Sequence, residues 1–147
     1  MNPVSVRSIG AFINIFNAAG QVLCVHRAYG DCTWSTPGGK VEDGEDPLQA
    51  VIRETQEEVG IDVSDVTFSG LYWKSYANDL VVSFVAHYNP DNFSFSSNVE
   101  ISAAGFFDAD HLPSPMATNT VVRIRDAVTR SAHRLTIFKA PDQYFLL

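Results

Sequence analysis

The sequence predicts an α/β fold in which a mixed central sheet carries helices on both faces. Segments rich in β-branched and aromatic residues occur both before and after a central helical segment. That segment, residues 47–59, has helix start and stop signals, and a second helix is expected near the C-terminus. Because the chain has 147 residues, 46% of them hydrophobic, we expect one domain spanning residues 1–147.

The first two strands are expected to form a hairpin. Residues 4–17 are rich in Val, Ile and Phe, and residues 22–27 form a second apolar run. Residues 17–20, Asn-Ala-Ala-Gly, supply the turn between them. Arg27 ends the second strand, where it either contacts a substrate phosphate or is simply an exposed charge.

The central helix has clear boundaries. Asp46 is a suitable N-cap, and Pro47 fits the first turn, where its missing N–H costs nothing. Gly60 provides the left-handed backbone that commonly ends a helix. At 100° per residue, one stripe of this helix is expected to face the core. Its members are Leu48, Val51, Ile52, Thr55 and Val59.

The opposite stripe of the helix is acidic. Glu54, Glu57 and Glu58 stand at i, i+3 and i+4, a spacing that makes their side chains neighbours. Neighbouring carboxylates repel one another and raise each other's pKa, so a cation among them would be stabilising. Oxygen ligands suit Mg²⁺ or Mn²⁺ better than zinc. A solvated acidic face is the alternative, but the Pro-Gly-Gly at residues 37–39 and the acid at Glu45 favour a metal and phosphate site.

Residues 39–61 resemble the Nudix box. That pattern is Gly, five residues, Glu, seven residues, Arg-Glu, an apolar residue, any residue, Glu-Glu, any residue, Gly and an apolar residue. Thr55 stands where an aliphatic residue is usual, but its methyl group can still pack and the acidic cluster is unaffected. Eight fixed positions match: Gly39, Glu45, Arg53, Glu54, Glu57, Glu58, Gly60 and Ile61.

The resemblance implies a Nudix α/β/α sandwich and a MutT-like hydrolase. Such enzymes cleave the diphosphate linkage of a nucleoside diphosphate derivative through metal-activated water, with Mg²⁺ or Mn²⁺ as cofactor. By the same resemblance, Glu57 and Glu58 are metal ligands, and the carbonyl of Gly39 or of its neighbour adds another. Glu54 is either a further ligand or the general base, braced by Arg53.

The strands after the helix are expected at residues 66–75 and 80–88, with a turn between them and a polar loop at 89–98. A short final strand is predicted around Phe106. Glu100, the only glutamate after Glu58, is a second candidate for the general base. Its alternatives are a fourth metal ligand or an exposed loop acid.

A second helix is expected from about residue 119 to residue 131. Its apolar positions are Val121, Val122, Ile124 and Val128, with Arg123, Arg125 and Arg130 directed outward. The last fifteen residues end in Tyr-Phe-Leu-Leu, which is expected either to pack on the domain or to form a homodimer contact.

Substrate recognition is expected from aromatic residues outside the box, because a nucleobase needs a stacking surface. Tyr72, Trp73 and Tyr76 lie near a strand end and are the candidates, with core packing as the alternative. The four histidines, His26, His87, His111 and His133, show no metal-ligand spacing and are interpreted as structural or surface residues.

Charge and cysteine content limit the classes of function. The net charge of −7 argues against binding to a nucleic-acid backbone, although a divalent cation would let an acidic site hold a diphosphate. No segment is apolar for long enough to span a bilayer, and no secretory signal is expected. Cys24, in a strand, and Cys32, in a loop, make no disulfide framework, so a reducing cytoplasm is the default.

Two rival functions accompany the same resemblance. An isopentenyl diphosphate isomerase needs a suitably placed catalytic cysteine, for which Cys32 is the only loose candidate. A non-catalytic nucleotide-sensing module often lacks a box carboxylate, whereas this chain keeps all of them. Release of phosphate in the presence of Mg²⁺ separates an enzyme from a sensor.

Overall fold

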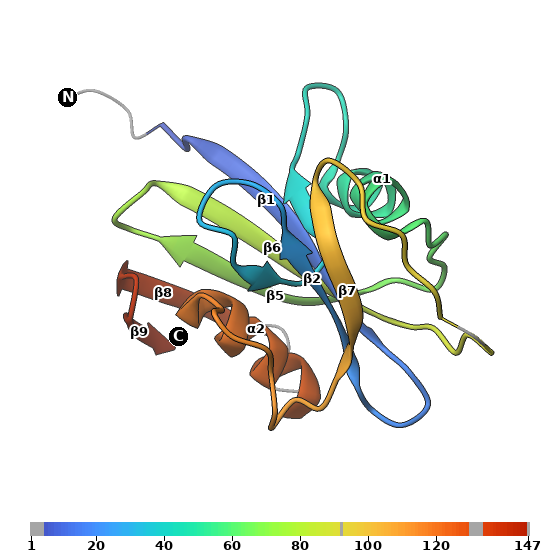
Figure 1. Ribbon diagram of the computed structural model, residues 1–147. Coiled ribbons are helices and arrows are strands. Elements are labelled where there is room, and N and C mark those ends of the chain that lie inside the picture. Colours follow the sequence, from blue (N-terminus) through green and yellow to red (C-terminus); the bar gives the residue numbers. More distant parts are fainter. Residues whose placement is uncertain (1–4, 92, 130–133, 147) are drawn as a thin grey trace.

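The computed structural model of the chain describes residues 5–91, 93–129 and 134–146, the last four of these as backbone only. In these ranges, two helices separate three groups of strands along the chain (Figure 1). Their order is β1 (Ser8–Phe16), β2 (Val22–Arg27), β3 (Trp34–Ser35), β4 (Gly38–Lys40), α1 (Pro47–Val59), β5 (Thr67–Lys74), β6 (Asp79–His87), β7 (Ile101–Phe107), α2 (Thr118–Thr129), β8 (Arg134–Ala140) and β9 (Gln143–Leu146).

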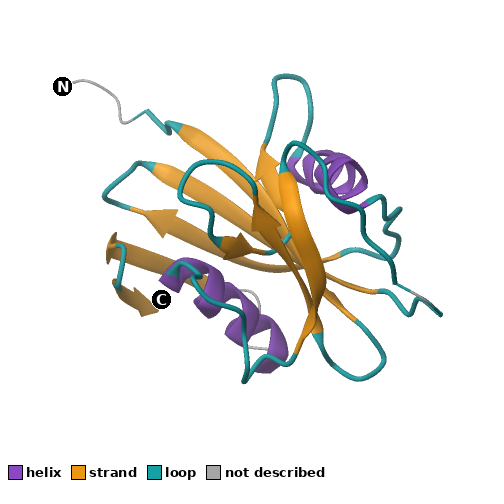
Figure 2. Ribbon diagram, viewed as in Figure 1, coloured by secondary structure: helices purple, strands orange, loops and turns teal. Residues whose placement is uncertain are grey.

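The strands within the described ranges form one mixed sheet. Its main path runs β3-β2-β1-β6-β5-β8-β9, while β4 pairs with β1 and β7 pairs with β2. β1 is parallel to β6 and β5 is parallel to β8, and the remaining pairs are antiparallel. The two helices cover opposite faces of this sheet (Figure 2). The predicted α/β/α sandwich with a mixed central sheet is therefore confirmed.

Side-chain alternation along β1 divides the core between the two faces. Ala11, Ile13 and Ile15 pack in the cluster that contains Val51 of α1. Phe16, of the other parity, packs with residues of α2. Successive side chains of a strand point to opposite faces, so one strand supports both helices.

The helix α1 has the predicted ends but a different buried stripe. The Asp46 side chain accepts a hydrogen bond from the Gln49 amide, and Gly60 is left-handed with φ 70°. Leu48 and Ile52, expected in the core, are 42% and 37% exposed. The expected core stripe is wrong at these two positions because the helix is rotated about its axis. Its buried residues are Ala50, Val51, Thr55 and Glu58.

The second helix also differs from expectation. Arg123, expected to point outward, is 3% exposed, whereas Val128 is 46% exposed. Its guanidinium lies over the Phe12 ring, which lets a charged residue occupy a buried position. The expected positions of Arg130, residue 131 and His133 lie outside the described residues.

The C-terminal part adds strands that the sequence did not indicate. The strand expected around Phe106 is β7, and it is not the last, since β8 and β9 follow α2. Arg134, Thr136 and Lys139 break the apolar pattern of β8, and its pairing partner β5 is distant in sequence. Residues 38–40, expected as loop, form β4 on β1. In the described ranges, no helix has the length and apolar character needed to cross a membrane.

Candidate functional site

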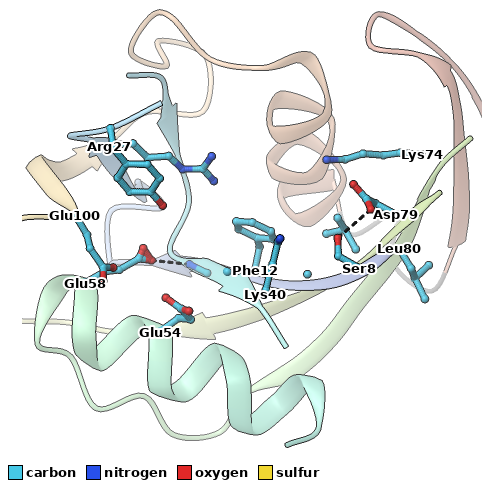
Figure 3. Close-up of a pocket in the computed structure, with 15 residues that line it drawn as sticks. Ser8, Phe12, Arg27, Lys40, Glu54, Glu58, Lys74, Asp79, Leu80 and Glu100 are labelled. Carbon is cyan, nitrogen blue, oxygen red and sulfur yellow. Dashed lines mark hydrogen bonds between the residues drawn. The ribbon is translucent and has the colours of Figure 1, made fainter. Parts of the chain in front are cut away.

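A cavity of about 640 Å³ lies where the N-terminal ends of β1 and β6 approach α1 and β4. Figure 3 shows Glu54, Glu58 and Glu100 at one end of it and Ser8, Lys74 and Asp79 at the other, with Phe12 and Lys40 between them. The described residues that line it are Ser8, Gly10, Phe12, Arg27, Tyr29, Gly38, Gly39, Lys40, Glu54, Glu58, Lys74, Asp79, Leu80, Val81 and Glu100.

Glu58 is the most deeply placed acid of the cavity. It is 6% exposed and accepts a hydrogen bond from the Gly38 amide at 2.9 Å. Burial raises the pKa of Glu58 to about 8, although the Gly38 hydrogen bond lowers it. The charges of Glu54 and Glu100 raise this pKa further, and Arg27 opposes them. The expectation that Glu58 faces away from the core is therefore wrong.

Glu54 lies directly against the backbone of β4. Burial is the largest cause that raises the pKa of Glu54, and Arg53 opposes it. A Cβ atom at Gly39 would stand 2.6 Å from Glu54 Oε1, closer than real Cβ contacts occur. Because glycine has no Cβ atom, position 39 leaves space for the Glu54 carboxylate.

Arg53 joins four groups around the acidic end. Its Nε and Nη2 donate to the two oxygens of Glu45 at 3.1 and 2.7 Å, in a bidentate pair. Nη1 donates to Glu54 at 3.1 Å and to Glu57 at 3.2 Å. Nη2 also contacts the carbonyl of Lys40 at 3.3 Å. The expected bracing contacts of Arg53 are present, and they tie α1 to the preceding loop and to β4.

The other predicted site residues divide between the cavity and elsewhere. Arg27 and Glu100 line it, as do Gly39, Glu54 and Glu58. Glu57 does not line it, and its side chain is 50% exposed. The metal and catalytic roles of these residues stay predictions.

The aromatic candidates do not line the cavity. Tyr72 is 2% exposed, and its hydroxyl donates to Asp126 at 2.7 Å. Tyr76 lies in the turn between β5 and β6. Strand alternation points Tyr72 into the core and Trp73 to the other face of β5. The stacking role expected for these three residues stays a prediction.

Sequence reasoning missed several residues of the cavity wall. Phe12 and Lys74 lie in strands whose apolar pattern concealed them, Asp79 was expected in the turn before the next strand, and Tyr29 was assigned only to a loop. Lys40 directly follows Gly39, so its position inside the box was a usable signal. The other residues missed are Ser8, Gly10, Leu80 and Val81.

The donor set suits a hard divalent cation. Among the described residues, no three histidine, cysteine or acidic side chains lie close enough together to form a complete metal site as they stand. The groups present are nevertheless carboxylates with raised pKa values and backbone carbonyls, the donors that Mg²⁺ and Mn²⁺ take. The residues fit such an ion by their chemistry, since a cation would relieve the repulsion among them.

Comparison with known proteins gives one family and several relatives. The model of the NUDIX domain family matches residues 6–128. An RNA pyrophosphohydrolase from Tolumonas auensis is 51% identical over 55 residues, which cover 37% of this chain and 31% of that protein. An 8-oxo-dGTP diphosphatase from Proteus vulgaris is 62% identical over 34 residues, which cover 23% of this chain and 30% of that protein. The matched stretches span about a third of each relative's length.

Solved structures match over more of the chain. A MutT NUDIX hydrolase from Burkholderia pseudomallei is 26% identical with a TM-score of 0.70, and the match covers 81% of this chain and 96% of that one. An ADP-ribose pyrophosphatase from Streptococcus suis is 24% identical with a TM-score of 0.72, covering 90% and 98%. Because the second match is only 24% identical, it supports the fold alone.

Proposed function

The chain belongs to the NUDIX domain family, and on this premise we propose that it is a divalent-metal-dependent pyrophosphohydrolase. Its substrate would be a nucleoside diphosphate derivative, cleaved at the diphosphate linkage by attack of water on phosphorus. In this proposal residues 1–147 act as one catalytic domain.

The charge distribution of the cavity is the observation that carries the proposal. Three carboxylates, Glu54, Glu58 and Glu100, gather at one end, the cations Arg27 and Lys40 line the wall beyond them, and Lys74 lines the far end together with Asp79. In a protein of net charge −7, three of ten basic residues thus meet in one cavity. A diphosphate has a high density of negative charge. It is stabilised by a metal cation bound to carboxylates and by positively charged side chains nearby.

We assign the metal to Glu54, Glu57, Glu58 and the Gly39 carbonyl, with Mg²⁺ or Mn²⁺ as the ion. When bound, the ion neutralises phosphate charge and lowers the pKa of water. Arg53 holds Glu57 near the acidic end through its 3.2 Å hydrogen bond. The same guanidinium ties α1 to the loop before it, so the carboxylates keep their spacing.

Two carboxylates are candidates for accepting the proton of the attacking water. Glu54 and Glu100 both line the cavity. Burial raises the pKa of Glu54, which favours a general base. Glu54 is therefore our first choice, and Glu100 is the second. Arg27 and Lys40 would hold phosphate oxygens, and Phe12 and Tyr29 replace Tyr72, Trp73 and Tyr76 as the aromatic contacts.

A substrate panel tests the proposal. Nucleoside triphosphates, nucleotide sugars, dinucleoside polyphosphates, ADP-ribose and a 5′-triphosphorylated RNA oligonucleotide are incubated with Mg²⁺ or Mn²⁺, and both products are identified. We expect cleavage of a diphosphate linkage in a small nucleotide, and weak activity on RNA because of the acidic surface. A protein that binds nucleotides with either ion but cleaves none would instead be a sensor.

Two further points belong to the same proposal. We propose a cytoplasmic location, supported by two free cysteines, of which Cys32 is exposed. We also propose a homodimer contact through the C-terminal segment, which sedimentation velocity would test against a monomer.

A further inference from the structure

The end of the cavity far from the carboxylate cluster contains a lysine and an aspartate that face each other without pairing. Lys74 and Asp79 are register partners in the antiparallel β5–β6 pair, and both line the cavity. Within the described part of the chain, every ion pair of 4.0 Å or less is made by Arg53, so these two form none. Both therefore keep hydrogen-bonding capacity toward the cavity (Figure 3).

Asp79 is held in position from one side. The hydroxyl of Ser8 donates to Asp79 Oδ1 at 2.9 Å, which fixes the carboxylate at the cavity wall. No other side-chain hydrogen bond to Asp79 occurs in the described residues, so Oδ2 is available as an acceptor. Lys74 is half-buried, and its ammonium can only donate. This end thus offers one donor and one oriented acceptor.

Phe12 supplies a flat apolar surface between this end and the acids. It lines the cavity, and the Arg123 guanidinium lies 4.5 Å from its ring centroid. Arg123 is 3% exposed and stands on the adjacent helix α2, so the ring is supported from behind. An aromatic ring held in this way suits stacking by a planar heterocycle.

We propose that Phe12, Lys74 and Asp79 select a 6-oxopurine base, with guanine preferred. Lys74 donates to the O6 acceptor, while the acceptor-only carboxylate of Asp79 takes the N1–H and the 2-amino group. Adenine presents the reverse pattern, a donor at C6 and an acceptor at N1, so its N1 would face the carboxylate unpaired. The inference rests on the proposed function, because the acidic end must hold the diphosphate of the same nucleotide.

Binding of uncleavable analogues tests the selection apart from catalysis. The Kd values of the α,β-methylene diphosphates of guanosine, inosine and adenosine are measured by calorimetry with the 147-residue chain and Mg²⁺. We expect guanosine to bind about tenfold more tightly than adenosine, with inosine between them because it lacks the 2-amino group. Equal binding of the three analogues, or no binding, would overturn the inference.

Two variants assign the contacts. Asp79→Asn should weaken the guanosine analogue about tenfold while adenosine binding stays unchanged or improves, because an amide can also donate to N1. Lys74→Met should weaken guanosine and inosine but not adenosine. A parallel loss for all three bases would mean that these residues only support the fold.

A control variant is available, and the results distinguish the proposed function from this inference. Asp62→Asn makes the same charge change at an exposed residue outside the cavity, and should leave all three Kd values as they are. Circular dichroism melts check that each variant is folded. Base selectivity without hydrolysis of any substrate would refute only the proposed function, whereas hydrolysis without base selectivity would refute only this inference.

Discussion

Each of the two helices buries one charged residue against its face of the sheet, and the two are stabilised differently. Glu58 of α1 is 6% exposed and accepts the Gly38 amide at 2.9 Å. Arg123 of α2 is 3% exposed, donates to the Thr120 hydroxyl at 3.2 Å and lies over Phe12, with Nε left without a partner. Burial disfavours the charged form of each side chain. It therefore raises the pKa of Glu58 to about 8 and lowers the pKa of Arg123 to about 10.

The difference lies in what each charge reaches. Glu58 lines the cavity, whereas Arg123 is separated from it by the Phe12 ring. A buried acid that faces a cavity is available to a proton or a cation, so its unfavourable burial is consistent with function. A buried arginine behind an aromatic ring supports the wall without lining the cavity.

Neutralising Glu58 should abolish most activity. Glu58→Gln keeps the size and an acceptor for the Gly38 amide but removes the charge, and we expect kcat/KM to fall about 10²- to 10³-fold because a metal ion supplies several kcal/mol. The kcat/KM of Glu57→Gln should fall by a similar factor if Glu57 binds the metal ion. Steady-state assays of both variants on the identified substrate check this. Unchanged turnover in both would contradict the metal assignment.

The same group should make metal-free stability depend on pH. The folded-state pKa of Glu58, about 8, lies above its ordinary value of 4.5, so the folded protein holds the proton longer. Stability from this group is present below about pH 4.5 and is lost as pH rises through about 8, by at most roughly 5 kcal/mol. Urea unfolding in EDTA should show this fall in the wild type and less of it in Glu58→Gln. Identical pH profiles would contradict the assigned burial.

Replacing the buried Arg123 should have a smaller effect than replacing Glu58. Arg123→Met fills similar space, loses the cation–π contact and removes the desolvated charge, so the free energy of unfolding should change by less than about 2 kcal/mol. Urea denaturation measures it, with exposed Arg125→Met as the matched control. A loss of the size expected for a broken buried ion pair would mean that Arg123 has an acidic partner.

The smallest effect is expected at Tyr72. Tyr72→Phe removes the 2.7 Å hydrogen bond to Asp126 and should cost about 1 kcal/mol of stability. Because Tyr72 does not line the cavity, KM should stay at the wild-type value. An increased KM in a fully folded variant would restore Tyr72 as a substrate contact.

The local signals of the chain predicted most of the fold. Asp46, Pro47 and Gly60 fix the ends of α1 because caps depend only on adjacent residues. The spacing of the box also predicted that Glu54 and Arg53 lie together. Periodicity did not predict how α1 is rotated about its axis, because the rotation depends on how β4 and Glu58 pack. For this reason Leu48 and Ile52 were wrongly expected in the core.

Distant pairings were beyond the sequence. β8 lies parallel to β5, and its polar residues conceal the strand pattern. Phe12 is far in the chain from Lys74 and Asp79, which face each other across the β5–β6 turn, and the three residues come together only when β1 pairs with β6. Arg123 was expected outside because an arginine is usually solvated, and its burial depends on the Phe12 ring and on the Thr120 hydroxyl, which accepts from it.

Gly39 has a consequence for mutational tolerance. The nearest approach of a hypothetical methyl group there is to Glu54 Oε1, at 2.6 Å. Even alanine would displace the Glu54 carboxylate, so a substitution in β4 would change the geometry of an acid on the next element, α1. Library design on this scaffold should hold Gly39 constant and vary the wall at Tyr29, which is 57% exposed.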